Sequence, residues 1–365
     1  MTELFLQYSG EIPDKYAVRE EGKLVEYGSA SNDGMAPGAV YCGRAGDCVK
    51  AQEAAFIILK ISGKETQRGY LKTTELKPGD RLPVQIIAPS ENGKPVRLTD
   101  KLRLSGRYTV LLLGEQLPEA QQVKLSGRIK DPAKRTELTE LGTKLLNGLF
   151  AWYRTEDIEP GFFAGGIIMR TASENADRDA ILTDACALKS VLNTIYRKYS
   201  ELSQNGGEGL IYVQPVDERL TDEYPDAEIK RGSEGLFERE GIDREYAKVS
   251  GHTVHLPSGG NIIIDRTAAM TVIDVNSDAA SARTRRELIL NTNLEAVEEI
   301  ARQLRLRKIT GITVCDLINM EDEADKSTVL QKIRALFEQD PAKPEVFGFT
   351  KLGLLEISRK RSVIS

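Results

Sequence analysis

The sequence predicts a mixed α/β protein built from several subdomains, and three observations support this fold class. The chain has 365 residues, which is too long for one simple hydrophobic core and predicts two to four subdomains. Residues 39–113 contain a run of short strand-like segments separated by turns. Further along, residues 271–320 follow a strand–helix–strand pattern, which is typical of a parallel βαβ unit.

The strand-like segments of residues 39–113 are AVYCGRAG, AAFIILKI, RLPVQIIA and YTVLLL. Polar or turn-rich segments such as SGKETQRG, ELKPGD and SENGKP lie between them. Short strands at this spacing predict a small antiparallel barrel.

The next hundred residues mix helix and strand. TELTELGTKLLNGLFAWY is predicted to be helical, and GGIIMRTASENADR to be a strand followed by a loop. A long amphipathic helix is expected for AILTDACALKSVLNTIYRKYSEL. Residues 205–215 should form a loop and then a strand. The acidic segment 216–235, which contains Pro225 and Gly232, is expected to be rich in loops.

Two aspartates in the C-terminal third end apolar runs 42 residues apart, Asp274 in TVIDVNS and Asp316 in ITVCDLINM. The segment between them has the periodicity of an amphipathic helix, with an apolar face made by Leu294, Val297, Ala301 and Leu304. The crossover should set the two strands side by side, with their carboxyl ends facing the crevice where ligands bind in such sheets. One aspartate alone would simply end a strand, but two that converge are suited to hold a divalent metal against phosphate oxygens.

Four segments around these aspartates carry a family resemblance. LPSGGNIIID at 256–265, IDVNS at 273–277, NTNLEAVEEIARQLRLRKITG at 291–311 and LGLLEISRKR at 352–361 resemble, in order, the ribonuclease E/G family. The resemblance is dense in the C-terminal third and looser elsewhere. It implies an Mg²⁺-dependent endoribonuclease that cleaves single-stranded RNA in RNA processing or decay.

The resemblance also implies an architecture and a catalytic set. It implies an OB-fold barrel inserted in a ribonuclease-H-like subdomain, followed by a region that senses the 5′ end and a DNase-I-like catalytic subdomain. The expected boundaries are 1–38 and 210–248 for the ribonuclease-H-like subdomain, 39–113 for the barrel, 114–209 for the sensor and 249–365 for the catalytic subdomain. Asp274 and Asp316 match the metal-binding aspartates, and the amide of Asn276 is expected to orient a carboxylate, a water or a phosphate oxygen.

The barrel segment matches the family at residues that would contact RNA. Phe56 and Tyr70 fall where the family places aromatic residues that stack on bases, and Lys94 falls where it places an RNA-contacting lysine. Phe56 lies inside AAFIIL, so a place in the barrel core is nearly as well supported. Tyr70 is therefore the better surface candidate.

The segment GIIMRTA resembles the pocket that senses a 5′-monophosphate. Arg170 would offer a bidentate guanidinium to phosphate oxygens, and Thr171 would offer a hydroxyl donor. Alternatively, an arginine and a threonine at a strand end form a solvent-exposed edge. The matching neighbours favour the sensor, namely Gly166, Ile167, Ile168 and Ala172.

Composition excludes several classes of protein. With 40% hydrophobic and 29% charged residues the chain should be soluble and globular, and no apolar run approaches 18 residues. The start lacks the features of a signal peptide, so a cytoplasmic protein is expected.

Four cysteines without CxxC spacing predict free thiols. His252 and His255 are the only histidines and are expected to be structural or rim residues rather than zinc ligands or catalytic bases.

The net charge of −5 argues mildly against a nucleic-acid partner, but local clusters matter more. Basic residues gather at 283–286, 302–308 and 359–361, around the two aspartates in sequence. We expect these clusters to form a phosphate-binding rim. The alternative for residues 302–308 is an ordinary solvated helix face.

Three departures from the family limit the resemblance. Asn319 stands where a family aspartate is expected, Lys351 replaces an arginine, and the chain ends without the cysteine-containing link that shares zinc between subunits. A monomer or a dimer built without zinc is therefore expected. The first departure also supports an alternative function, an RNA-binding protein of the same fold that has lost cleavage. A third possibility, a DNA-directed or small phosphodiester hydrolase, fits the barrel and the Arg170 pocket less well.

Overall fold

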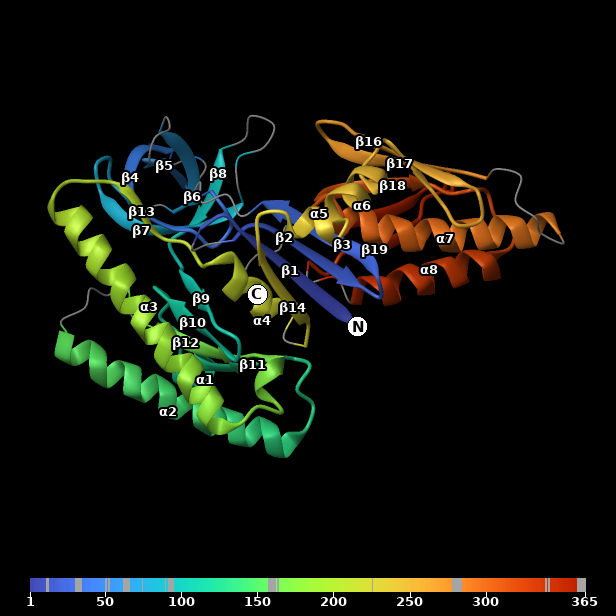
Figure 1. Cartoon of the computed structure of the whole chain (residues 1–365). Coiled ribbons are helices and arrows are strands. Elements are labelled where there is room, and N and C mark those ends of the chain that lie inside the picture. The colour runs from blue at the N-terminus through green and yellow to red at the C-terminus, as the bar shows by residue number, and fades with distance from the viewer. Residues whose placement is uncertain are drawn as a thin grey trace. The chain divides into compact units, whose positions relative to one another are not determined.

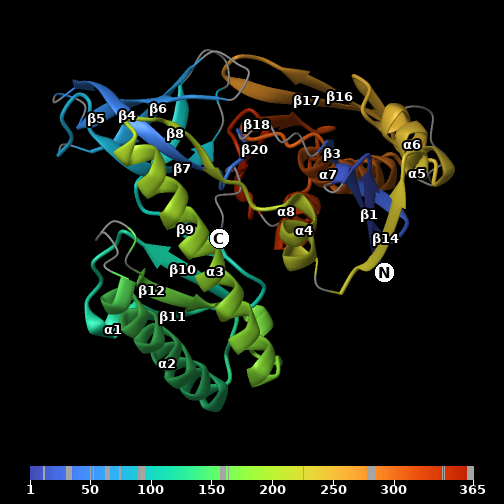
Figure 2. The same ribbon diagram turned by 60° about the vertical axis from the view of Figure 1, so that its left-hand side comes forward.

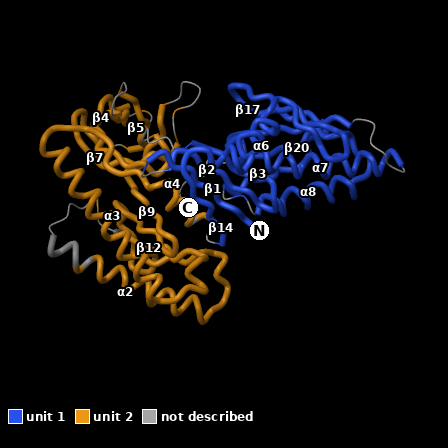
Figure 3. The backbone as a smooth tube through the Cα atoms, viewed as in Figure 1, with its two compact units in different colours: residues 1–30, 226–362 blue, residues 31–225, 363–365 orange. Residues whose placement is uncertain are grey.

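The computed structural model describes residues 1–359 except 11–12, 30–34, 50, 52, 62–65, 74, 89, 91–94, 157–161, 163, 225, 278–283, 339 and 341. The chain divides into two compact units (Figures 1 and 3). Unit 1 contains residues 1–30 and 226–362, and unit 2 contains residues 31–225 and 363–365. Among the described residues, no helix is both long and apolar enough to span a membrane.

One sheet of unit 1 joins the N-terminal segment to residues from the middle of the chain. Its order is β14-β1-β2-β3, and β1 runs parallel to β14 and antiparallel to β2. The strands are β1 (Thr2–Tyr8), β2 (Pro13–Glu20), β3 (Lys23–Ser29) and β14 (Glu228–Ser233). Phe5, Ala17 and Leu24 pack against the apolar residues of two short helices, α5 (Leu236–Arg239) and α6 (Ile242–Val249).

The segment 216–235 is more regular than the sequence predicted. It contains helix α4 (Val216–Glu223), which belongs to unit 2, and strand β14. Leu220 of α4 is fully buried, and β14 finds a parallel partner in β1, more than 200 residues earlier in the chain. The prediction of a loop-rich segment was wrong, because Leu220 gives α4 a buried side and β14 pairs with a strand distant in the sequence.

The second sheet of unit 1 contains the two aspartates. Its order is β15-β16-β17-β18-β20-β19, with β17 and β18 parallel and the other neighbours antiparallel. The strands are β15 (Thr253–His255), β16 (Asn261–Arg266), β17 (Met270–Asn276), β18 (Gly311–Asp316), β19 (Glu345–Phe349) and β20 (Leu355–Arg359). Helices α7 (Arg285–Leu306) and α8 (Glu323–Glu338) lie against one face of this sheet (Figures 1 and 2).

The βαβ unit predicted from the sequence is confirmed as β17, α7 and β18. Val297, Ala301 and Leu304 are buried beneath the sheet, and Leu294 is partly buried there. Helix α7 begins before the predicted segment, because the side chain of Thr284 caps it by accepting a bond from the N–H of Glu287 at 3.1 Å.

Unit 2 contains a closed five-stranded barrel of OB-like strand order. The order is β4-β5-β6-β8-β7, closed by the pairing of β4 with β7, and β13 adds to the outside of β4. The pair β6–β8 is parallel, so the barrel is not entirely antiparallel. The strands are β4 (Val40–Val49), β5 (Ala54–Leu59), β6 (Gln67–Lys72), β7 (Arg81–Ala88), β8 (Val96–Thr99) and β13 (Gly209–Tyr212).

The strand YTVLLL, expected in the barrel, belongs to a second sheet of unit 2. Strand β10 (Thr109–Leu113) lies between its antiparallel neighbours in the order β11-β12-β10-β9, and all five of its residues are buried. The other strands are β9 (Arg103–Ser105), β11 (Val123–Leu125) and β12 (Ala164–Met169). The run reads equally well as a barrel strand or a central sheet strand, and its pairing with distant β12 decided between them.

The predicted helices of unit 2 are confirmed and contribute to the core of this sheet. They are α2 (Pro132–Glu156) and α3 (Arg178–Gln204), preceded by a short α1 (Glu119–Gln122). The core they share includes Leu111, Leu146, Met169 and Leu192. A single 3₁₀ turn, η3 (Thr171–Ser173), follows β12 directly.

Candidate functional site

Asp274 and Asp316 are direct register partners on neighbouring parallel strands. Asp274 of β17 pairs with Asp316 of β18, at the carboxyl ends of both strands. Successive side chains alternate between the faces of a sheet, so the buried Ile273 and Cys315 point to the helices. The two aspartates therefore lie together on the opposite face, which α7 and α8 do not cover.

The surroundings of the pair fit a hard cation. The amide of Asn276 donates from Nδ2 to Oδ2 of Asp274 at 2.8 Å, and both side chains are half-buried. Asp316 is exposed, and its carboxylate has no hydrogen bond or ion pair with any residue that the structure describes. No group of three or more His, Cys, Asp or Glu residues able to hold a metal occurs within the described ranges. Two carboxylates with room for water and substrate oxygens suit Mg²⁺, which usually takes only one or two protein carboxylates.

Asn293 is a buried polar residue that the sequence analysis did not single out. It has no exposed surface, and its amide binds both backbone groups of Ile318 in the loop after Asp316. Its Nδ2 donates to the carbonyl of Ile318 at 2.8 Å, and its Oδ1 accepts from the N–H of Ile318 at 3.0 Å. An asparagine within the apolar stripe of an amphipathic helix was the available signal, since a buried amide needs partners.

Glu295 holds the loop on the other side of the site in a similar way. Its carboxylate accepts a bond from the N–H of Ser258 at 2.9 Å. Ser258 belongs to the LPSGG turn, which leads into β16 and is closed by the bond from Leu256 N–H to the Gly260 carbonyl at 2.7 Å. Helix α7 thus fixes two loops that border the carboxyl end of β17 and β18.

The two histidines have different surroundings. His252 Nε2 lies 2.8 Å from Oδ1 of Asp265, and both side chains are exposed. His255 ends β15 and pairs in register with Asn261, which pairs in turn with Asn276. His255 therefore lies on the same face as the aspartates, two strands away from β17, which agrees with its expected place on a rim.

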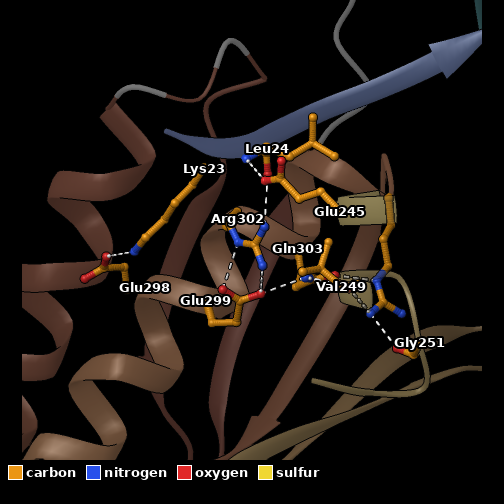
Figure 4. A network of polar contacts seen from close by, with 10 residues as sticks. Lys23, Leu24, Glu245, Val249, Gly251, Glu298, Glu299, Arg302 and Gln303 are labelled. Atoms are coloured by element: carbon orange, nitrogen blue, oxygen red, sulfur yellow. Dashed lines mark hydrogen bonds and ion pairs between the residues drawn. The ribbon is translucent and has the colours of Figure 1, made fainter. Parts of the chain in front are cut away.

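The basic cluster at residues 302–308 is used inside unit 1, so its prediction as a phosphate-binding rim was wrong. Figure 4 shows Arg302 binding Glu299 of the same helix and the carbonyl of Leu24 in β3. Arg305 is buried and makes two bonds with the Glu20 carboxylate, at 2.8 and 2.9 Å. These contacts join α7 to the N-terminal sheet.

The end of this cluster is engaged in the same way. Arg307 Nη2 donates to the carbonyls of Val249 and Gly251, at 3.2 and 2.7 Å, and burial lowers the pKa of its guanidinium. Lys308 donates to the hydroxyl of Tyr16. The solvated-face alternative was equally wrong for most of the cluster, because Arg302, Arg305 and Arg307 are all at least half-buried.

The other two basic clusters are partly engaged as well. Arg286 forms ion pairs at 2.8 Å with Asp322 and Asp325, and its guanidinium lowers the pKa of Asp325. Arg359 is buried and binds Asp340 through Nε at 2.8 Å. Arg283, Lys360 and Arg361 lie outside the described residues.

The aromatic candidates of the barrel lie side by side on its outer surface. Phe56 and Tyr70 are register partners on β5 and β6, with ring centroids 6.2 Å apart in an edge-to-face arrangement. Ala55 and Ile57 point into the barrel core, so Phe56 points outward, and its interpretation as a core residue was wrong. The guanidinium of Arg68 lies over the Phe56 ring, 4.7 Å from its centroid. Lys94 lies outside the described residues.

Arg170 and Thr171 lie at the junction of β12 and η3. Arg170 is half-buried, and its Nη1 donates to the carbonyl of Gly106 at 2.5 Å. Thr171 is exposed, and its hydroxyl lies 2.7 Å from the hydroxyl of Ser126. The two residues are thus attached to the segments before β10 and after β11, which brings a guanidinium and two hydroxyl groups to one end of this sheet.

Comparison with known proteins gives consistent matches along the chain. The sequence model described as "Ribonuclease E/G family" matches residues 103–231 and 212–362. Ribonuclease G of Escherichia coli (strain K12) is 29% identical over 375 residues, covering 89% of this chain and 73% of that protein. Ribonuclease G of Haemophilus influenzae is 30% identical over 79% of this chain and 60% of that protein. Ribonuclease E of Nostoc sp. (strain PCC 7120) is 30% identical over 89% of this chain and 51% of that protein.

Proposed function

The chain belongs to the ribonuclease E/G family, and we propose that it is an Mg²⁺-dependent endoribonuclease that cleaves single-stranded RNA and favours a 5′-monophosphorylated end. The names of its relatives support an endoribonuclease acting in RNA processing. The observation that carries the proposal is the direct pairing of Asp274 with Asp316 on one open face of a sheet. Two adjacent carboxylates at the ends of parallel strands repel each other, and a bound cation would relieve this repulsion.

Three residues have roles at the reacting phosphate in this proposal. Asp274 and Asp316 would hold the Mg²⁺ ion, which supplies charge stabilisation and an acidified water when bound. Asn276 keeps one Asp274 oxygen fixed through its 2.8 Å bond, and this leaves the other oxygen free for the ion. Asn293 and Glu295 attach the two loops beside these strand ends to α7.

Two further groups would bind the RNA chain. Phe56 and Tyr70 offer neighbouring rings on which bases of any sequence can stack, worth about 1–3 kcal/mol for each base. Arg170 and Thr171 would receive the phosphate at the 5′ end through charge-assisted bonds. Lys94 remains a predicted contact from the sequence.

The test is cleavage of a labelled single-stranded RNA by the purified protein, with and without Mg²⁺. We expect internal cuts only with Mg²⁺. We also expect faster cutting of 5′-monophosphorylated RNA than of 5′-hydroxyl RNA, by about tenfold at subsaturating substrate, because a charge-assisted contact contributes roughly 1.5–3 kcal/mol. RNA binding without any cleavage would instead support the RNA-binding alternative that Asn319 suggests.

A further inference from the structure

We propose that Asp184 is a positioning residue for the 5′-end contact, acting through the turn at residues 106–109 to orient the guanidinium of Arg170. The inference rests on the proposed role of Arg170 in binding the 5′-phosphate. Asp184 lies on helix α3, 14 residues after Arg170 in the chain.

The carboxylate of Asp184 is the acceptor for a whole turn of backbone. Its Oδ1 accepts from the N–H of Arg107 at 2.8 Å. Its Oδ2 accepts from the N–H groups of Tyr108 and Thr109, at 3.2 and 3.0 Å, and from the Thr109 hydroxyl at 2.7 Å. An ionised carboxylate only accepts hydrogen bonds, so its two oxygens can accept from all four of these donors. Few other side chains could do this.

Gly106 shows how closely the turn and the carboxylate fit. A Cβ atom at residue 106 would lie 2.4 Å from Oδ1 of Asp184, so only glycine allows this approach. The N–H of Gly106 donates to the carbonyl of Thr109 at 2.8 Å and closes the turn between β9 and β10. The position of the Gly106 carbonyl therefore depends on the bonds to Asp184.

The same turn holds Arg170 at two points. The carbonyl of Gly106 accepts from Arg170 Nη1 at 2.5 Å, and the carbonyl of Tyr108 accepts from the Arg170 N–H at 2.8 Å. The guanidinium has no other hydrogen bond in the described part of the chain, which leaves Nε and Nη2 for a phosphate. The arginine is thus oriented before RNA binds, which lowers the entropy cost of the contact.

The test uses the ratio of cleavage rates on 5′-monophosphate and 5′-hydroxyl RNA. In Asp184→Asn the Nδ2 group would face backbone N–H donors, so the turn loses acceptors and Arg170 loses its orientation. We expect the ratio to fall from about tenfold to about threefold or less, while the rate on 5′-hydroxyl RNA stays unchanged. In the double variant Asp184→Asn/Arg170→Ala the ratio should equal that of Arg170→Ala alone, because both changes act on one contact.

The matched control is Asp179→Asn, an exposed acidic residue on the same helix whose ratio should remain that of the parent. Thr109→Val removes only the 2.7 Å hydroxyl bond and should lower the ratio less than Asp184→Asn does. If Asp184→Asn does not fold, the ratio in Thr109→Val tests the positioning role of Asp184. A parent ratio near one would overturn the 5′-end contact itself. A clear parent ratio that survives Asp184→Asn, or equal slowing on both RNAs, would overturn the positioning role alone.

Discussion

Two charged regions of unit 1 differ in whether their charged side chains bind other residues. One is the carboxyl ends of β17 and β18, and the other is the end of α7. At the strand ends, the exposed carboxylate of Asp316 has no hydrogen bond or ion pair among the described residues, and there the carboxylate of Asp274 is bonded only to Asn276. Arg302 and Arg305 of α7, and Arg307 directly after it, all bind other parts of unit 1. Figure 4 shows the contacts of Arg302. Both regions were candidates for contact with RNA. The difference teaches that the number of charges in a segment does not say whether those charges are available to a ligand.

The largest effect expected from this comparison is on catalysis. Asp274→Asn should lower the Mg²⁺-dependent cleavage rate by about a thousandfold, because it removes a charged ligand without changing core volume. The measurement is single-turnover cleavage of a labelled RNA. The matched control, Asp265→Asn, changes an exposed aspartate on the same sheet face and should stay within about twofold of the parent.

Folding of these variants can be followed at Cys315, the neighbour of Asp316. Burial raises the pKa of its thiol to about 12, so it should resist alkylation at pH 8 in a folded protein. Cys186 is exposed and serves as the reactive reference. Equal losses of activity in Asp274→Asn and Asp265→Asn, with Cys315 protected, would contradict the assignment of the site.

The second effect is on stability and concerns the basic cluster. Arg305→Ala should lower the free energy of unfolding by about 3 kcal/mol, because it leaves Glu20 without its partner and breaks a largely buried pair. Urea unfolding measures this loss. Lys23→Ala removes an exposed pair with Glu298 in the same region and should cost less than about 1 kcal/mol. If Arg305→Ala weakened RNA binding and left stability intact, the cluster would face RNA after all.

A smaller effect is expected at Asn276. Asn276→Ala should reduce cleavage by about tenfold, because Asp274 loses the bond that fixes its Oδ2 atom but keeps its charge. A titration of rate against Mg²⁺ concentration should show weaker apparent binding of the ion. A rate as low as that of Asp274→Asn would mean that Asn276 has a more direct role at the reacting phosphate.

The smallest effect concerns the salt dependence of RNA binding. Each lost phosphate contact to single-stranded RNA changes the slope of log K against log salt by about 0.7. Arg302→Gln should change this slope by less than about a third of that value, because Arg302 already binds Glu299 and Leu24. A change in the slope of about 0.7 would show that Arg302 contacts an RNA phosphate.

The sequence determined the local elements and the pairing of the aspartates. Apolar periodicity identified β17, α7 and β18, and the right-handed crossover rule then required the two strand ends to lie together. Helices α2 and α3 followed from the same kind of pattern. These features depend on residues close in sequence, where side-chain spacing fixes which face is buried.

Only the tertiary structure decided which polar groups are available. The partners of Arg305, Asp184 and β14 lie between 75 and 285 residues away in the chain, so no local pattern reveals them. Phe56 points outward because the neighbouring residues of β5 face the barrel core. Strand β10 pairs with β12 and therefore belongs to a different sheet from the barrel. Charge and hydrophobicity belong to a residue, but burial and hydrogen bonding depend on which distant segments fold against it.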